Sequence, residues 1–443
     1  MENILSNKQF LIFIAVLALF GLGLPIFYPI YDGDAAQFAL RVINNAPVPA
    51  GAMLQKLSYQ FLGHTDFIFR LPSFVYTILS VVLFFVALRR KFPIGLATTG
   101  TLLFMLLAGT YWSSFSIEPY GFALFMSTLS FLCLLLFKET YKIQYMLFMA
   151  LFGFLAFWGN TFDYTPRFSN LSNFLLFNLI HLPLIISYFF RKKTLFDLDM
   201  KRSLAMDLGA TLLATVFIQK AEWLALVVSV PTLSYILITE LEALKADNYS
   251  GFNLLKPLSA IQLVVFFFIG VMALVLAYQG FGKVDAALAR DGMSKILPIV
   301  IVLWITSFAS TIIAFMTHSR QALLVILLLG YALANFILSV SFFPFLNQSA
   351  LVGHQQLRTK INDAEVQLTI DTTPKDSIIS PGFRYVQAMY FSSKSPQAVK
   401  YRLSPQPLHD SLLLNRYQLQ DSLNCRLLPY QLTKRNYKLY RAF

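Results

Sequence analysis

Apolar segments as long as a membrane helix recur along most of this chain and constrain its fold more than any other feature. A membrane-spanning helix needs roughly 20 mostly apolar residues, and runs of that length recur from residue 10 to residue 346. The hydrophobic share of 57%, the charged share of 13% and the mean hydropathy of +0.63 do not suit a protein whose whole surface faces water. The sequence therefore predicts an α-helical polytopic membrane protein.

Eleven spans can be drawn in this region, at about 10–30, 68–88, 92–110, 118–137, 143–159, 174–190, 203–220, 222–240, 258–279, 296–317 and 321–343. Basic residues fall in alternate loops, as in RRK at 89–91, KETYK at 138–142 and HSR at 318–320, and such loops stay in the cytoplasm. An odd number of spans then places the C-terminus on the opposite side from a cytoplasmic N-terminus. We expect a multi-pass protein of the inner (plasma) membrane whose C-terminal region is periplasmic or extracellular. A re-entrant hairpin around Lys220 and Glu222 is an alternative that leaves this parity unchanged.

Residues 347–443 are more polar and form a second predicted domain after the transmembrane domain of residues 1–346. They carry 13 Lys and Arg against 6 Asp and Glu, hence +7 of the net charge of +13, which suits a surface beside anionic lipid or phosphate. Segments such as EVQLTI and YRLS, separated by turn-rich loops, predict strands. We therefore expect a small extracytoplasmic α/β or α+β domain. Nucleic acid is not an expected partner, because no recognition motif is present.

Cysteine and histidine give no metal or redox signature. Cys133 lies in an apolar run and Cys425 in the polar tail, so no disulfide between them is expected and neither belongs to a zinc-ligand pattern. Four histidines without ligand spacing are interpreted as structural or surface residues: His64, His318, His354 and His409. The first apolar run has no small-residue cleavage site after it, so a cleavable signal peptide is not expected.

Residues 31–66 form a first outer loop that is too long for a turn and too polar for a span. Helical spacing in DAAQFALRVINN places Asp34, Phe38 and Arg41 on one face. After the PVP break, a second helix carries an apolar stripe that suits the membrane interface, formed by Met53, Leu54, Leu57 and Phe61. Asp34 either caps the helix that it opens or acts at an outer cavity as general base or metal ligand; Asp32 beside it is a turn residue or a second acidic candidate.

The motifs of this loop resemble those of the GT-C membrane glycosyltransferases, in the branch of the protein O-mannosyltransferases and the bacterial aminoarabinose transferases. The corresponding residues are Asp34 with Phe38 and Ala39 for the family's Asp and Tyr-Ala, Pro47 and Pro49 for its proline turn, Leu62 and Gly63 for its Phe-Gly, and Arg70, Leu71, Pro72 and Ser73 for its RLPS motif. Ala35 and Ala46 stand where the relatives have Glu and Lys, and Arg41 lies two residues early. Lys56 is the candidate replacement for that lysine.

The resemblance implies an enzyme that moves a sugar from a polyprenyl-phosphate carrier to a lipid or protein acceptor outside the membrane. Such a transfer needs a carboxylate to deprotonate the acceptor hydroxyl and cations to stabilise the leaving phosphate. Asp34 is the expected base and Glu118 the next acidic candidate, unless Glu118 only complements a helix dipole. Arg70, with Arg41 and Arg290 behind it, is the expected phosphate ligand because a guanidinium binds phosphate oxygens in pairs. As an alternative, Arg70 anchors the end of a span.

Three questions stay open at this point. Asp163 and Arg167, in NTFDYTPRFSN, are either acceptor-side residues or part of a plain connection. No metal-ligand set is assigned, although some relatives use a divalent metal. A non-catalytic GT-C-like scaffold that binds lipid or protein partners is the second functional hypothesis, favoured by Ala35 and Ala46. A transporter is the third, and few ionisable residues at mid-span depth argue against it.

Overall fold

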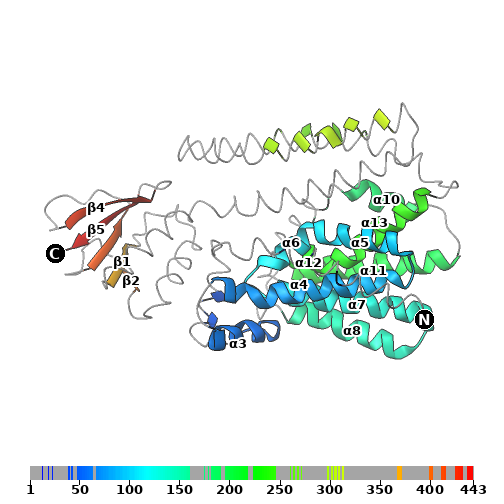
Figure 1. Cartoon of the computed structure of the whole chain (residues 1–443), viewed down its shortest axis with the longest axis horizontal. Helices are drawn as coiled ribbons and strands as arrows, with labels where there is room; N and C mark the ends of the chain where they lie inside the picture. The colour runs from blue at the N-terminus through cyan, green and yellow to red at the C-terminus, as the bar shows by residue number, and fades with distance from the viewer. Residues whose placement is uncertain are drawn as a thin grey trace.

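The computed structural model describes residues 47–62, 66–159, 181–190, 195–217 and 223–245, together with five strands after residue 366 and single positions elsewhere (Figure 1). The described helices are η2 (Ala50–Ala52), α3 (Met53–Leu62), α4 (Asp66–Arg89), α5 (Ile94–Leu106), α6 (Ala108–Phe115), α7 (Tyr120–Thr140), α8 (Ile143–Trp158), α10 (Leu182–Phe190), α11 (Leu195–Phe217), α12 (Leu224–Val228) and α13 (Val230–Lys245). These helices form a bundle in which α7 contacts α4 and α8 (Figure 1).

The predicted spans 68–88, 118–137 and 143–159 correspond to α4, α7 and α8. Among the described helices, Phe67–Arg89 and Tyr120–Thr140 are long and apolar enough to cross a membrane, and the bent pair of α5 and α6 would make a third span. The count of eleven stays a prediction, because much of the predicted first span and of the last three lies outside the described residues.

The predicted span 92–110 is not one straight helix. α5 ends at Leu106, Leu107 is extended with a ψ of 140°, and α6 continues at an angle of 61°. The break removes the usual helical donor from the Phe104 carbonyl, and the Thr110 hydroxyl donates to that carbonyl at 2.6 Å. Every residue of α6 is buried, so the segment from Trp112 to Phe115, which lies between the predicted spans 92–110 and 118–137, is a buried helix. Apolar composition continues through Leu107, which is why periodicity alone did not reveal the break.

Two other predicted spans also differ in detail. α11 begins at Leu195, so Lys201 and Arg202 lie within the helix and not in the preceding loop. The predicted span 222–240 is divided into α12 and α13. Ser229 stands at the division, and its hydroxyl donates to a carbonyl one turn earlier at 3.2 Å. Such bonding of a helix hydroxyl to its own backbone commonly accompanies a bend.

Aromatic side chains join four helices at the centre of the bundle. Phe84 of α4 stacks on Phe104 of α5, with ring centroids 4.5 Å apart. Phe131 of α7 contacts Phe84 at 5.9 Å and Tyr235 of α13 at 5.4 Å. α8, in contrast, exposes large apolar side chains that include Met146, Leu147, Phe148, Leu151 and Phe154. A helix with such an exposed face suits contact with lipid.

Glycines allow two pairs of helices to approach closely, as small residues do in membrane bundles. A Cβ on Gly121 of α7 would lie 2.2 Å from the carbonyl oxygen of Ser73 in α4. A Cβ on Gly109 of α6 would lie 2.4 Å from the carbonyl oxygen of Leu226 in α12. Backbone therefore packs directly on backbone at both places.

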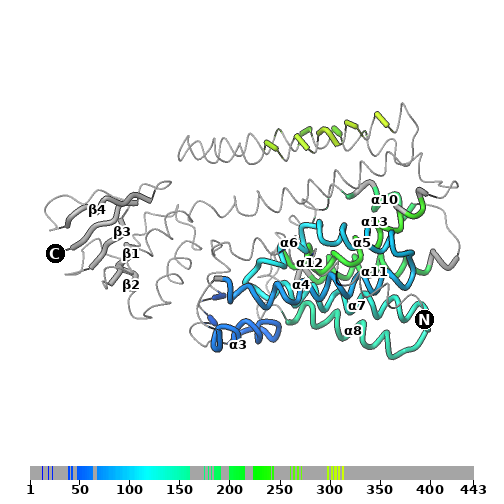
Figure 2. Tube along the Cα trace, viewed as in Figure 1, coloured from blue at the N-terminus to red at the C-terminus, as the bar shows by residue number. Residues whose placement is uncertain are grey.

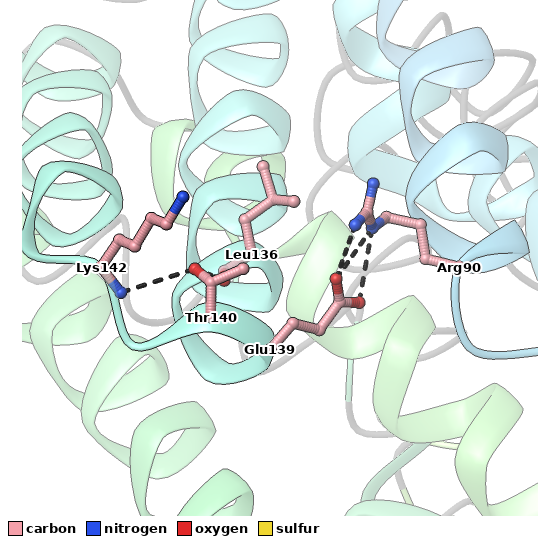
Figure 3. Close-up of polar contacts among 5 residues, drawn as sticks. All are labelled: Arg90, Leu136, Glu139, Thr140 and Lys142. Carbon is pink, nitrogen blue, oxygen red and sulfur yellow. Dashed lines mark hydrogen bonds and ion pairs between the residues drawn. The ribbon is translucent and has the colours of Figure 1, made fainter.

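Charged residues at the ends of α4 and α7 form an ion pair (Figure 3). Arg90 donates to both carboxylate oxygens of Glu139, with an Nη2 to Oε2 distance of 2.7 Å. This hydrogen bond raises the pKa of the Arg90 guanidinium. Lys138, one residue before Glu139, pairs with Asp199 of α11 at 2.5 Å. The RRK and KETYK segments therefore lie at the same end of the bundle, as their common basic character predicts.

The described C-terminal strands form one mixed sheet (Figure 1). They are β1 (Gln367–Asp371), β2 (Val399–Arg402), β3 (Ser411–Asn415), β4 (Cys425–Leu432) and β5 (Tyr437–Ala442), in the order β2-β1-β3-β5-β4. β1 is parallel to β2 and β3, with Leu368 opposite Val399 and Leu412, whereas β5 is antiparallel to β3 and β4. EVQLTI and YRLS overlap β1 and β2. Any helices of this region lie outside the described residues, so the α/β domain over 347–443 stays a prediction.

Candidate functional site

A small apolar cluster packs the first outer loop onto the beginnings of α4 and α7. Its buried members are Phe38, Ala39, Val42, Ala52, Phe69 and Ile117. Tyr59 of α3 also packs against this cluster, and its ring stacks on Phe69 at a centroid distance of 5.0 Å. Burial raises the pKa of Tyr59, so its phenol stays neutral. Three segments far apart in the sequence are therefore held at one place.

Three of the predicted site residues adjoin this cluster. Arg41 lies within the helical turn that contributes Phe38 and Val42, Arg70 follows Phe69, and Glu118 follows Ile117. Arg70 is only 3% exposed, whereas Arg41 and Glu118 are half-buried. The fold therefore gathers the segments that carry two guanidinium groups, which suit a phosphate, and one carboxylate, which is a group able to accept a proton.

A chain of hydrogen bonds joins α3, α4 and the segment before α7. Gln55, which is fully buried, donates from Nε2 to the Ser73 hydroxyl at 3.1 Å. Ser73 in turn donates to the backbone carbonyl of Glu118 at 3.0 Å. The same carbonyl accepts the backbone N–H of Tyr120 at 2.7 Å. Ser73 belongs to the RLPS motif, so the motif acts here as a contact between segments.

The α3 helix lies beside α4 (Figure 2) and is fixed at a second point as well. The backbone N–H of Gly51, in η2, donates to the carbonyl of Gly159 at the end of α8, at 3.0 Å. Pro47 and Pro49 precede η2 in non-helical conformation, which confirms the predicted proline break. α3 is therefore connected through η2 to α8 and through Gln55 to α4.

The predicted apolar stripe of α3 faces away from the protein. Its members are exposed to different degrees: Met53 by 59%, Leu54 by 43%, Leu57 by 44% and Phe61 by 81%. Lys56, the predicted replacement cation, is half-buried on the same helix. The helix and its exposed stripe are confirmed, and its place in the membrane interface stays a prediction.

Several predicted site residues lie outside the described residues: Asp32, Asp34, Asp163, Arg167 and Arg290, together with Ala35 and Ala46. Their roles stay predictions. In the part of the chain that the structure describes, no three His, Cys, Asp or Glu residues gather to hold a metal ion. The alternative of a divalent metal stays open, because Asp34 and Asp163 are not among those residues.

The structure also places ionisable side chains inside the bundle that the sequence analysis did not single out. Asp207 of α11 accepts a hydrogen bond from the Thr232 hydroxyl, and the fully buried Glu240 of α13 accepts one from Ser187 at 3.3 Å. His181, at the beginning of α10, is 1% exposed. An acid within an apolar run was the available signal, because such a residue usually has a partner or a function.

Apolar side chains at described positions near residues 263–268 and 304–308 line an open groove of about 490 Å³. It is lined by Leu263, Val264, Phe267, Trp304, Ile305 and Phe308. Phe267 stacks on Trp304 with ring centroids 5.4 Å apart. A groove with this lining suits a hydrocarbon chain.

The apolar helix bundle, its bent span and the loop helix packed on the beginnings of α4 and α7 are those of a helical membrane protein, and the overall fold is similar to the GT-C fold of a solved membrane protein. Solved structures of ArnT from Cupriavidus metallidurans share this fold over 98% of both chains, at 10% sequence identity. The TM-score is 0.50 for ArnT in the apo state and 0.52 for ArnT bound to undecaprenyl phosphate. No known family model and no curated protein matches the sequence.

Proposed function

We propose that this protein is a GT-C glycosyltransferase that transfers a sugar from a polyprenyl-phosphate carrier to a lipid or protein acceptor on the outer side of the membrane. The observation that carries the proposal is the packing of the first outer loop beside Arg70 and Glu118. The fold shared with ArnT supports it, as does the structure of ArnT bound to undecaprenyl phosphate. The apolar groove supports a prenyl-linked ligand as well.

The reaction assigns a different task to each group. Asp34 removes the proton from the acceptor hydroxyl, which then attacks the anomeric carbon of the sugar as the bond to the phosphate breaks. Arg70, assisted by Arg41 or Lys56, stabilises the phosphate that leaves with the carrier. The burial of Arg70 strengthens this attraction, because charges interact more strongly where water is excluded.

A scaffold without catalytic activity is the second candidate. It is favoured by Ala35 and Ala46, which stand where the resembling enzymes have an acid and a lysine. Such a protein would use the same cations to bind a lipid phosphate without breaking the sugar bond. Turnover, and not binding, separates the two candidates.

Asp34→Asn tests the proposal, with Asp32→Asn as its matched control. Full-length protein in lipid nanodiscs is incubated with radiolabelled polyprenyl-phosphate sugars and a membrane extract that supplies acceptors. We expect transfer by the wild-type protein, a loss of about 10²- to 10⁴-fold in Asp34→Asn, as is typical when a general base is removed, and near-normal transfer in Asp32→Asn. Normal transfer by Asp34→Asn would exclude Asp34 as the base.

Arg70→Gln provides a separate test of phosphate binding. We expect this variant to bind undecaprenyl phosphate at least about tenfold more weakly than the wild-type protein, since it loses a charge-assisted hydrogen bond. Wild-type protein that binds the carrier and never turns it over would favour the scaffold instead.

A further inference from the structure

Gln55 occupies an unusual place for an amide, since it lies on the protein-facing side of a helix whose exposed face is apolar. The side chain is fully buried, although the helix is short and lies at the edge of the bundle. An apolar side chain of similar size would fill the space without a polar group that needs partners. A buried amide at this position is therefore favoured only through the hydrogen bonds that it makes.

The chain of hydrogen bonds fixes the orientation of the amide. Ser73 has one hydroxyl proton, and the Glu118 carbonyl can only accept, so Ser73 must donate to Glu118. The Gln55 atom that faces Ser73 must then be the donor, Nε2. Among the residues that the structure describes, Oε1 of Gln55 has no hydrogen-bond partner. Within the described part of the chain, the contact to Ser73 is therefore the one hydrogen bond that this side-chain amide makes.

The contact to Ser73 bears on the predicted phosphate ligand Arg70 and on the acidic candidate Glu118. Ser73 lies three residues after Arg70, so the two occupy neighbouring positions on one face of α4. Its hydroxyl is bound to the carbonyl of Glu118. One turn further along α4, the Thr77 hydroxyl lies 3.0 Å from that of Ser113 in α6 and also donates to the Ser73 carbonyl. Ser73 is therefore the point at which α3, α4 and the beginning of α7 are set relative to one another.

We propose that Gln55 is a positioning residue, which acts through Ser73 to hold Arg70 where it can bind a lipid-linked phosphate and to hold the segment of Glu118 beside it. This inference rests on the proposed function for its ligand, and on the hydrogen bonds for its geometry. Gln55 does not itself contact the substrate. It is distinct from the residues that the sequence motifs single out, because it matches none of them.

The test compares Gln55→Met with Gln60→Met in the full-length protein. Gln60 lies on the same helix but is exposed, so the second variant makes the same chemical change outside the hydrogen-bond chain. Undecaprenyl phosphate is the probe, and its dissociation constant is measured alongside the melting temperature. We expect Gln55→Met to bind about tenfold more weakly, as the loss of one buried hydrogen bond predicts, and Gln60→Met to bind within about twofold of wild type.

A double-mutant cycle with Ser73→Ala separates positioning from simple packing. If Gln55 acts through Ser73, the double variant binds no more weakly than Ser73→Ala alone. The proposal would be overturned if the two substitutions multiplied their separate losses of affinity in the double variant, or if Gln55→Met bound with wild-type affinity. Ser73→Ala also provides a second variant should Gln55→Met fail to fold, since it removes an atom without adding volume; wild-type affinity in Ser73→Ala would equally overturn the proposal.

Hydrogen–deuterium exchange distinguishes failure of this inference from failure of the proposed function. Wild-type protein that does not bind undecaprenyl phosphate would contradict the proposed phosphate site. Faster exchange over residues 116–121 in Gln55→Met than in Gln60→Met would then still support the positioning role, because it reports release of the segment that Ser73 holds. Equal exchange in the two variants would exclude that role.

Discussion

The backbone N–H of Gly51 donates to the carbonyl of Gly159 at 3.0 Å. This bond joins η2, which directly precedes α3, to the end of α8. Neither glycine leaves room for a side chain. A Cβ on Gly51 would lie 2.6 Å from the ring of Phe122 and 2.7 Å from the Gly159 carbonyl oxygen. The loop helix is therefore placed by a backbone contact, in addition to its apolar cluster.

Gly51→Ala should weaken this attachment. The methyl group has to displace the Gly159 carbonyl or the Phe122 ring, and such overpacking costs about 1–3 kcal/mol. We expect a lower melting temperature for the purified protein and faster proteolysis within residues 50–62. Gly95→Ala is the matched control, because a Cβ there meets nothing within 4 Å; the control should be neutral or slightly stabilising. Equal melting temperatures for the two variants would contradict the contact.

Gly121→Ala should disturb the contact between α4 and α7. A Cβ there would lie 2.2 to 2.7 Å from three backbone atoms of Ser73, and backbone cannot rotate away as a flexible side chain can. We expect a loss of about 1–3 kcal/mol or more in stability and a loss of affinity for undecaprenyl phosphate, because Arg70 and Glu118 flank this contact. Thermal unfolding and lipid binding measure the two effects. Wild-type stability in this variant would show that the helices are farther apart.

The two ion pairs at the end of the bundle that carries the RRK and KETYK segments should differ in their contribution to stability. Arg90 is 44% exposed and Glu139 27% exposed, so a double-mutant cycle on this pair should give only about 0–1 kcal/mol, falling as salt is added. Lys138 is 9% exposed, so Asp199→Asn leaves a buried ammonium without its carboxylate and should cost about 1–3 kcal/mol. Lys138→Met should lower the stability less than Asp199→Asn does, because it also removes the buried charge. The reverse order in thermal unfolding would contradict the burial of Lys138.

The side of the membrane that the C-terminal region faces can be tested at Ser392. Ser392→Cys in intact cells should react with a membrane-impermeant maleimide from outside, since an odd number of spans separates it from a cytoplasmic N-terminus. The experiment uses a Cys425→Ser background, because Cys425 lies in the same C-terminal region as Ser392, whereas Cys133 is buried. Thr140→Cys at the end of α7 serves as the control on the predicted cytoplasmic side. Labelling of Ser392→Cys only after the cells are opened would require an even number of spans.

The residues of the first outer loop illustrate how far the sequence reaches into the site. The stripe of Met53, Leu54, Leu57 and Phe61 predicted a helix with one apolar face, and α3 has that face exposed. In a helix that meets lipid, the apolar stripe turns outward and the remaining face meets protein. Gln55 lies on that remaining face. Its burial therefore follows from the sequence once the apolar stripe is assigned to lipid and the opposite face to protein. Its partners could not have been recognised, because they are far away in the sequence. Ser73 lies 18 residues after Gln55, and Glu118 lies a further 45 residues after Ser73.

The sequence by itself determined the membrane class, the approximate bounds of several spans and the common side of the RRK and KETYK loops. These properties depend on local hydropathy, on bilayer thickness and on charge, all of which can be read residue by residue. Only the tertiary structure decided that the third predicted span bends at Leu107 and that Arg70 is buried beside the segment of Glu118. Both depend on hydrogen bonds and close packing between helices, which are set by the side chains that meet in space and not by the order in which they occur.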